Sequence, residues 1–190
     1  GATLVAAIDT HVHADHVSGV RAVADATGAE IVLPDGVDDR GIEYEADRLL
    51  DDGDAIAVGD VSLETLALPG HTPEGVGFRT ADDEHGDLLL AGDTLFLDAV
   101  ARPDLAVEAD EVEAMARDLH ASLAKLRELP DETRVAPGHV AAPTSADEGG
   151  RYLATIGALR DRHELLSLSE EAFVEAVTDS LPDRPANDAR

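Results

Sequence analysis

The hydrophobic positions of the chain fall into several short apolar runs and a few longer periodic stretches. Short runs bounded by glycine, proline or acidic residues predict buried strands. These runs lie at residues 4–8, 30–33, 55–58, 61–68, 75–80, 88–91 and 133–136. Between residues 110 and 129 the apolar residues recur every three or four positions, which predicts an amphipathic helix ending at Pro130. Strands interleaved with helices predict an α/β fold, classed as α+β in some schemes.

Three further segments have helical patterns, and their ends carry ordinary helix signals. They lie at residues 18–28, about 147–166, and 169–179. Gly28 follows the first of them as a C-terminal stop, and Ser169 opens the last as an N-cap. The length of 190 residues suits one good-sized domain. We therefore expect a single domain over 1–190, with a C-terminal helix and tail from about 167 to 190.

The net charge of the chain makes some classes of binding partner unfavourable. The chain has 41 acidic and 14 basic residues, for a net charge of −27. Such a field disfavours nucleic acid and anionic membranes as partners. The acids are scattered through a chain with clear apolar periodicity, which argues against disorder and predicts adaptation to concentrated salt. Cysteine is absent, which excludes disulfides and a thiol nucleophile, and no signal peptide opens the chain, so we expect a cytoplasmic protein.

The strongest chemical signal follows the first apolar run. Residues 10–16 hold four potential metal ligands, namely His11, His13, Asp15 and His16. In an extended segment, side chains two apart share a face, so His11 and His13 can point at one ion. Imidazole and carboxylate are ligands for zinc and iron. Burying several imidazoles together without a partner is costly, so the cluster predicts a metal site instead of ordinary hydrogen-bonded histidines.

Three later strands also end in a glycine followed by a potential ligand. The ligands are His71, Asp93 and His139. His71 alone is explained more simply as a turn histidine, whereas a buried aspartate at position 93 needs a partner or a metal. Sites in α/β proteins collect at strand ends along one sheet edge, so together with residues 10–16 they predict one shared site. Near them, Arg102 could form a weak surface ion pair with Asp104 or hold an anionic substrate group, and the residues alone leave both open.

These motifs, taken in order, resemble those of the metallo-β-lactamase superfamily. The matching stretches are residues 10–16, 69–72, 92–94 and 138–139. The resemblance implies an αββα sandwich with metals at the open edge of two sheets. It implies one metal site made by His11, His13, His71 and Asp93. It implies a second made by Asp15, His16, Asp93 and His139.

Within the superfamily the chain is similar to the glyoxalase II branch, and most of all to its persulfide dioxygenases. Residues 101–105, 168–173 and 181–185 carry this similarity. Two positions depart from the pattern, because Ala101 and Glu74 stand where glycine is usual. Family members usually have a strand-rich segment before the first motif, and only the run at 4–8 precedes it here. We therefore expect one sheet to lack N-terminal strands.

The resemblance implies two enzymatic activities for one ligand set. In the favoured one, a single Fe(II) held by His11, His71 and Asp93 oxidises a low-molecular-weight thiol persulfide to sulfite with O₂. Asp15 and Arg102 are the expected catalytic residues, with Arg102 orienting the thiol carrier. In the alternative, two Zn(II) ions activate a water that hydrolyses a thioester. A third reading is a metal-binding domain without turnover, and family members are often homodimers.

Overall fold

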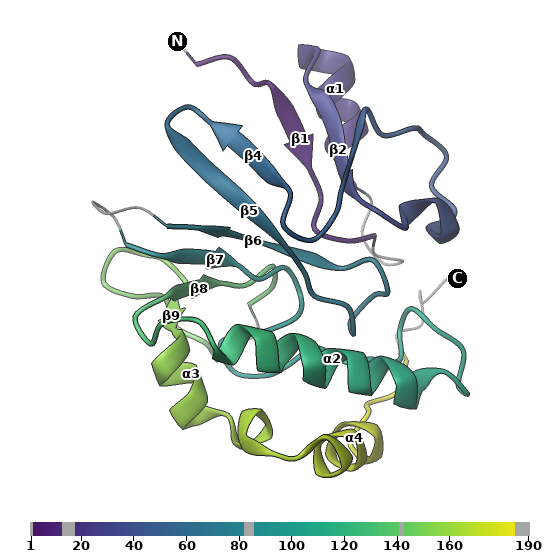
Figure 1. Cartoon of the computed structure of the whole chain (residues 1–190), viewed down its shortest axis with the longest axis vertical. Helices are drawn as coiled ribbons and strands as arrows, with labels where there is room; N and C mark the ends of the chain where they lie inside the picture. Colours follow the sequence, from purple (N-terminus) through teal and green to yellow (C-terminus); the bar gives the residue numbers. More distant parts are fainter. Residues whose placement is uncertain (1, 13–17, 82–85, 141–142, 185–190) are drawn as a thin grey trace.

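Two facing β-sheets form the centre of the molecule, and helices cover the outer face of each (Figure 1). The computed structural model describes residues 2–12, 18–81, 86–140 and 143–184. The smaller sheet has the order β1-β2-β3, from β1 (Ala6–Ile8), β2 (Glu30–Pro34) and β3 (Arg48–Leu50). Its strands pair in parallel. Helix α1 (Val20–Thr27) and the short 3₁₀ helix η1 (Val37–Arg40) accompany this sheet.

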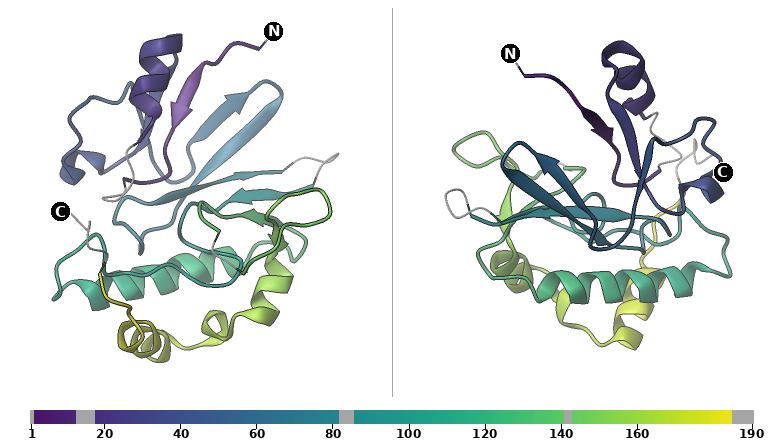
Figure 2. Two further views of the ribbon diagram at one scale, coloured as in Figure 1. Left: turned by 180° about the vertical axis from the view of Figure 1, so that it is seen from behind. Right: turned by 45° about the horizontal axis from the view of Figure 1, so that its top comes forward.

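The larger sheet has six strands in sequence order. They are β4 (Ala55–Val58), β5 (Val61–Ala67), β6 (Val76–Thr80), β7 (Leu88–Leu90), β8 (Arg134–Ala136) and β9 (Ala154–Thr155). On its outer face lie α2 (Val112–Arg127), α3 (Ile156–Arg162), the 3₁₀ helix η2 (Glu164–Ser167) and α4 (Glu170–Asp179). Figure 2 shows the two sheets between their helical layers from two further sides. The predicted αββα sandwich is confirmed.

Three apolar clusters fill the spaces between the four layers. In β2, Leu33 packs against the residues of α1, whereas Val32 belongs to the cluster between the two sheets. This strand is buried on both faces, which explains its continuous apolar sequence. The largest cluster joins the six-stranded sheet to α2 and α4, with Leu89, Leu119 and Phe173 all fully buried. Among the described helices, none is long and apolar enough to cross a bilayer.

The predicted helix over residues 147–166 is wrong in its first half. The Asp147 carboxylate accepts the backbone N–H groups of Gly149 and Arg151, and Gly150 takes a left-handed φ of 74°. A turn therefore replaces the first helical turns. Strand β9 follows and pairs with β8, and α3 begins only after Thr155, whose side chain accepts the N–H of Ala158. The sequence analysis also missed β3, a three-residue strand.

Candidate metal centre

The larger sheet brings three of the predicted ligands to one edge. Strands β7 and β8 are parallel neighbours, and β5 runs in the same direction because two antiparallel pairings separate it from β7. The loops after these three strands carry His71, Asp93 and His139. In the facing sheet, the chain after β1 carries His11. The N–H of Val76 in β6 donates to the Thr10 carbonyl at 2.9 Å, which ties that segment to the larger sheet.

Three side chains converge at this edge, namely His11, His71 and Asp93. Each offers one ligand atom, and the three atoms lie within 4.8 Å of one another. Asp93 Oδ2 lies 3.8 Å from Nε2 of His11 and 3.8 Å from Nε2 of His71. The two rings meet edge to face with centroids 5.1 Å apart. Asp93 and His71 are only 5% and 6% exposed, so the cluster lies largely inside the protein.

The second nitrogen of each imidazole holds its ring in place. His71 Nδ1 lies 3.2 Å from the carbonyl oxygen of Arg102, and His11 Nδ1 lies 2.8 Å from Oγ1 of Thr10. A carbonyl oxygen only accepts hydrogen bonds, so His71 Nδ1 carries a proton. In the neutral imidazole the lone pair is then on Nε2, the atom that faces Asp93. Ligating histidines typically bind an oxygen through the other ring nitrogen in this way.

This donor set fits a transition metal. Two imidazole nitrogens and one carboxylate oxygen form the two-histidine, one-carboxylate set found in non-haem Fe(II) oxygenases, and the same groups suit zinc. The 3.8 Å separations exceed the 2.7–3.2 Å of a direct hydrogen bond, which leaves the three atoms spaced around a common point. The His11, His71 and Asp93 positions predicted from the strand ends therefore meet in one place.

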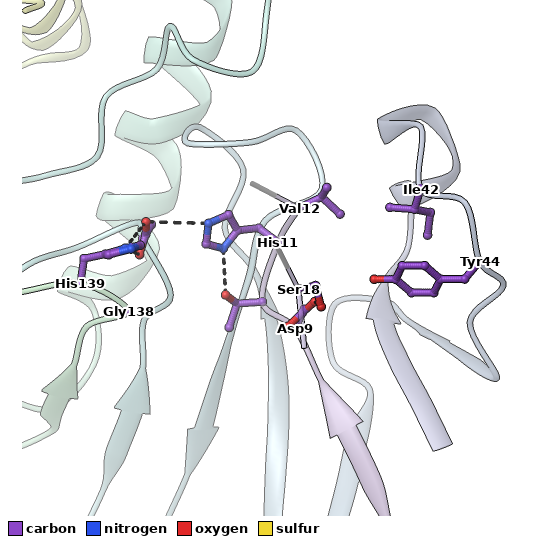
Figure 3. Close-up of a pocket in the computed structure, with 10 residues that line it drawn as sticks. Asp9, His11, Val12, Ser18, Ile42, Tyr44, Gly138 and His139 are labelled. Atoms are coloured by element: carbon purple, nitrogen blue, oxygen red, sulfur yellow. Dashed lines mark hydrogen bonds and ion pairs between the residues drawn. The ribbon is translucent and has the colours of Figure 1, made fainter. Parts of the chain in front are cut away.

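His139 also reaches Asp93, but through a hydrogen bond. Its Nδ1 lies 2.8 Å and 2.6 Å from the two carboxylate oxygens of Asp93. The His139 side chain is 47% exposed, in contrast to the other two histidines. In this arrangement His139 orients the carboxylate (Figure 3). The remaining predicted ligands, His13, Asp15 and His16, lie outside the described residues, so the second metal site stays a prediction.

The glycines before the ligands have a steric reason. Gly92 has a φ of 52°, and a Cβ there would come within 3.0 Å of Thr10 Oγ1. A Cβ at Gly138 would lie 2.4 Å from Oδ1 of Asp93 and 3.1 Å from the Gly92 carbonyl oxygen. The backbone of the His139 loop therefore passes directly over the Asp93 carboxylate, and only glycine leaves room for it.

Gly138→Ala tests this packing. We expect the metal affinity to fall by about 10- to 100-fold, because the new methyl group must displace the Asp93 carboxylate. The unfolding midpoint should change little, since residue 138 lies at the exposed surface and its φ is not positive. Chelator competition and circular dichroism measure the two quantities. Gly19→Ala is the control, because no atom of the described residues lies within 4 Å of its Cβ position. Equal affinities for the two variants would contradict the packing argument.

Arg102 contributes its carbonyl oxygen to His71, but its guanidinium points elsewhere. Nε and a terminal nitrogen bind the two Asp104 oxygens at 2.9 and 2.8 Å, and the guanidinium also donates to the carbonyl of Pro182 at 2.8 Å. Burial raises the pKa of Asp104, but Arg102 and Arg184 outweigh it and hold that pKa below its usual value. These contacts favour the ion pair over the substrate contact as the role of this guanidinium.

A cavity of about 360 Å³ opens onto the cluster. His11, Asp93 and His139 line one side of it, and Ile42 and Tyr44 line the other. The Tyr44 hydroxyl points across the cavity toward the side of Asp9 and His11 (Figure 3). Neither residue carries a chemical signal in the sequence, and both lie in the acidic segment between η1 and β3. A second, mostly apolar cavity of about 250 Å³ shares His139 and is lined by residues that include Phe96 and Val140.

The sequence matches a known protein family and is similar to characterised proteins. Residues 1–139 match the family model of the metallo-beta-lactamase superfamily. The chain is 37% identical to a hydroxyacylglutathione hydrolase of Rhizobium johnstonii over 68% of its length and 46% of the relative's. It is 31% identical to the human persulfide dioxygenase ETHE1 over 93% of its length and 62% of the relative's.

A solved structure is similar to this chain in fold. ETHE1 from Myxococcus xanthus superposes with a TM-score of 0.76 at 30% identity, covering 95% of this chain and 71% of that one. The chain spans about half to two thirds of the length of the curated relatives it matches. Dioxygenases and hydrolases both occur among these relatives at similar identity.

Proposed function

The chain belongs to the metallo-beta-lactamase superfamily, in its glyoxalase II-like branch, and from this premise we propose that it is a mononuclear Fe(II) persulfide dioxygenase. Its substrate would be a low-molecular-weight thiol persulfide and its product sulfite. The coarser conclusion, a metalloenzyme of this superfamily, rests on the family match and the His11, His71 and Asp93 cluster.

One observation carries the choice of a mononuclear centre. Three donor atoms converge, whereas His139 uses its Nδ1 to bind the carboxylate of Asp93. Two histidines and one carboxylate are the ligands of non-haem Fe(II) oxygenases, which leave coordination positions open for substrate and O₂. The similarity to the human dioxygenase over 93% of the chain supports the same choice.

In this set, the chemistry that a bound Fe(II) supplies is the activation of O₂. The protein contributes orientation and enclosure. The Arg102 carbonyl keeps the proton of His71 on Nδ1, and Thr10 and His139 hold the His11 ring and the Asp93 carboxylate. The adjoining cavity of about 360 Å³ would confine the persulfide next to these side chains, which makes its reaction with the second reactant an oriented one.

A dinuclear thioester hydrolase is the second candidate. The hydroxyacylglutathione hydrolase relative is 37% identical, and the motif residues Asp15 and His16, with Asp93 and His139, would supply the second site. Two metals would generate a nucleophilic water at neutral pH. This candidate requires His139 to turn from the Asp93 carboxylate toward a metal.

Metal content and oxygen uptake separate the two candidates. We expect protein purified without oxygen to carry about one iron per chain and to consume O₂ promptly on addition of a low-molecular-weight persulfide. An oxygen electrode and sulfite determination give the stoichiometry. About two zinc ions per chain, no uptake, and cleavage of a glutathione thioester would instead establish the hydrolase.

A further inference from the structure

An ion pair between Arg40 and the buried Glu74 lies against the backbone of Val12, next to His11, and the proposed reaction does not use it. We propose that this pair is a positioning device that fixes the backbone of the His11 segment and joins it to the wall of the substrate cavity. The proposal rests on the proposed metal centre. It assigns a role to Glu74, a position where the sequence departs from the glycine that the family resemblance implies.

Glu74 lies in the turn between the His71 loop and β6, and its side chain is only 1% exposed. Its Oε1 accepts the backbone N–H of Val12 at 2.8 Å, and its Oε2 lies 3.3 Å from Nε of Arg40. A buried carboxylate is costly unless its charge is paired and its oxygens are bonded. Here Oε1 accepts a hydrogen bond from the backbone next to a metal-binding candidate, whereas Oε2 has charge pairing with Arg40 but no hydrogen bond from the described residues.

Arg40 also binds the backbone of Val12, at its carbonyl group. It ends η1, and its guanidinium donates to the carbonyl of Val12 at 3.5 Å and to the carbonyl of Ala106 at 3.1 Å. The N–H and C=O of Val12 are therefore both held, one by Glu74 and one by Arg40. Val12 directly follows His11, so the two side chains fix the peptide groups next to this ligand.

The same pair connects the ligands to the cavity wall. Gly41 and Ile42 directly follow Arg40, and Ile42 and Tyr44 line the cavity opposite His11. Glu74 comes three residues after His71, and Ala106 follows the Arg102 carbonyl that holds His71. Moving Arg40 would thus shift the wall that faces the substrate, whereas the Val12 N–H, in the peptide group attached to His11, would stay bound to Glu74. We therefore expect the contact of Glu74 with Val12 to govern metal affinity and the contact of Glu74 with Arg40 to govern substrate affinity.

Two variants of Glu74 separate the contact with Val12 from the contact with Arg40. Glu74→Gln keeps an acceptor for the Val12 N–H but loses the charge that holds Arg40. We expect a metal affinity within about 3-fold of the parent and a KM for the persulfide raised by about 10-fold. Glu74→Ala loses both contacts, and its metal affinity should fall by about 10- to 100-fold. Chelator competition with Zn(II) or Fe(II) gives the affinities, and amide hydrogen exchange at Val12 shows protection retained in the first variant and lost in the second.

Arg79→Gln is the control. Arg79 forms an ion pair with Asp87, with the nitrogen and oxygen 2.8 Å apart, and neither residue belongs to the metal cluster, although this pair is more exposed than Glu74 and Arg40. The control variant should lower the unfolding midpoint without changing metal affinity. Unchanged Val12 exchange and metal affinity in folded Glu74→Ala would overturn the positioning role. If that variant does not fold, the exchange rate of the Val12 amide in the parent protein and in Glu74→Gln decides instead. An unprotected Val12 amide in either protein would also overturn the positioning role. A parent protein that binds metal but does not oxidise persulfide would refute the proposed function alone, since affinity and exchange still report on the pair.

Discussion

Replacing Asp93 with alanine is expected to abolish both metal binding and turnover. Asp93 Oδ2 lies 3.8 Å from the facing nitrogens of His11 and His71, so the variant removes the one carboxylate that the cluster offers. Of the three described residues of the cluster, two imidazoles remain, and neither supplies a negative charge to a divalent cation. Metal analysis after anaerobic purification and oxygen uptake with a persulfide measure the two losses. Circular dichroism should show a folded protein, since the site lies on loops at the sheet edge.

His139→Ala provides the matched comparison, because it removes a side chain that touches Asp93 without joining the cluster of three. In a mononuclear enzyme it should weaken metal affinity by about 10- to 100-fold while leaving the stoichiometry at saturation unchanged. In a dinuclear enzyme it would remove a ligand of the second ion, and the stoichiometry at saturation would fall by about half. Retention of full metal content by Asp93→Ala would refute the ligand assignment itself.

The positions of the candidate ligands could be predicted from sequence because they depend on a local pattern. A glycine followed by a candidate ligand is visible after three of the strands, and strand direction then brings His71 and Asp93 to one edge. The rule does not require exact strand bounds, so errors of one or two residues did not disturb it. It does not give the orientation of a side chain, and the Nδ1 contact of His139 with Asp93 could not be foreseen.

Contacts between segments far apart in the chain could not be predicted from the sequence. Glu74 was noticed only as a departure from glycine, and its partner Val12 lies 62 positions away along the chain. For Arg102, two roles stayed open until the structure showed its guanidinium on Asp104 and on a carbonyl 80 positions further along. The helix predicted over 147–166 failed for the same reason. Its residues Ala154 and Thr155 form β9 and pair with β8, a partner that periodicity alone cannot detect.

Molar potassium chloride is expected to stabilise the protein strongly. A net charge of −27 on 190 residues makes the folded state repel itself, and salt shortens the range of that repulsion from about 10 Å at 0.1 M to about 3 Å at 1 M. If screening restores about 3–5 kcal/mol, the unfolding midpoint rises by about 10 °C, at about 2–4 °C per kcal/mol for a chain of this size. Chloride is the salt to use, because sulfate strengthens apolar burial whatever the charge.

Helix α4 allows the cause to be tested at one residue. Glu171, Glu175 and Asp179 are exposed and spaced four apart, so like charges face each other along one side of the helix. Glu175→Lys turns both repulsive pairs into attractive ones and should stabilise the protein by about 1 kcal/mol in dilute buffer. In molar potassium chloride that gain should largely vanish. A gain of equal size at both salt concentrations would mean that helix propensity causes it, and a parent midpoint that stays flat with salt would exclude charge repulsion as a major term in the stability of this fold.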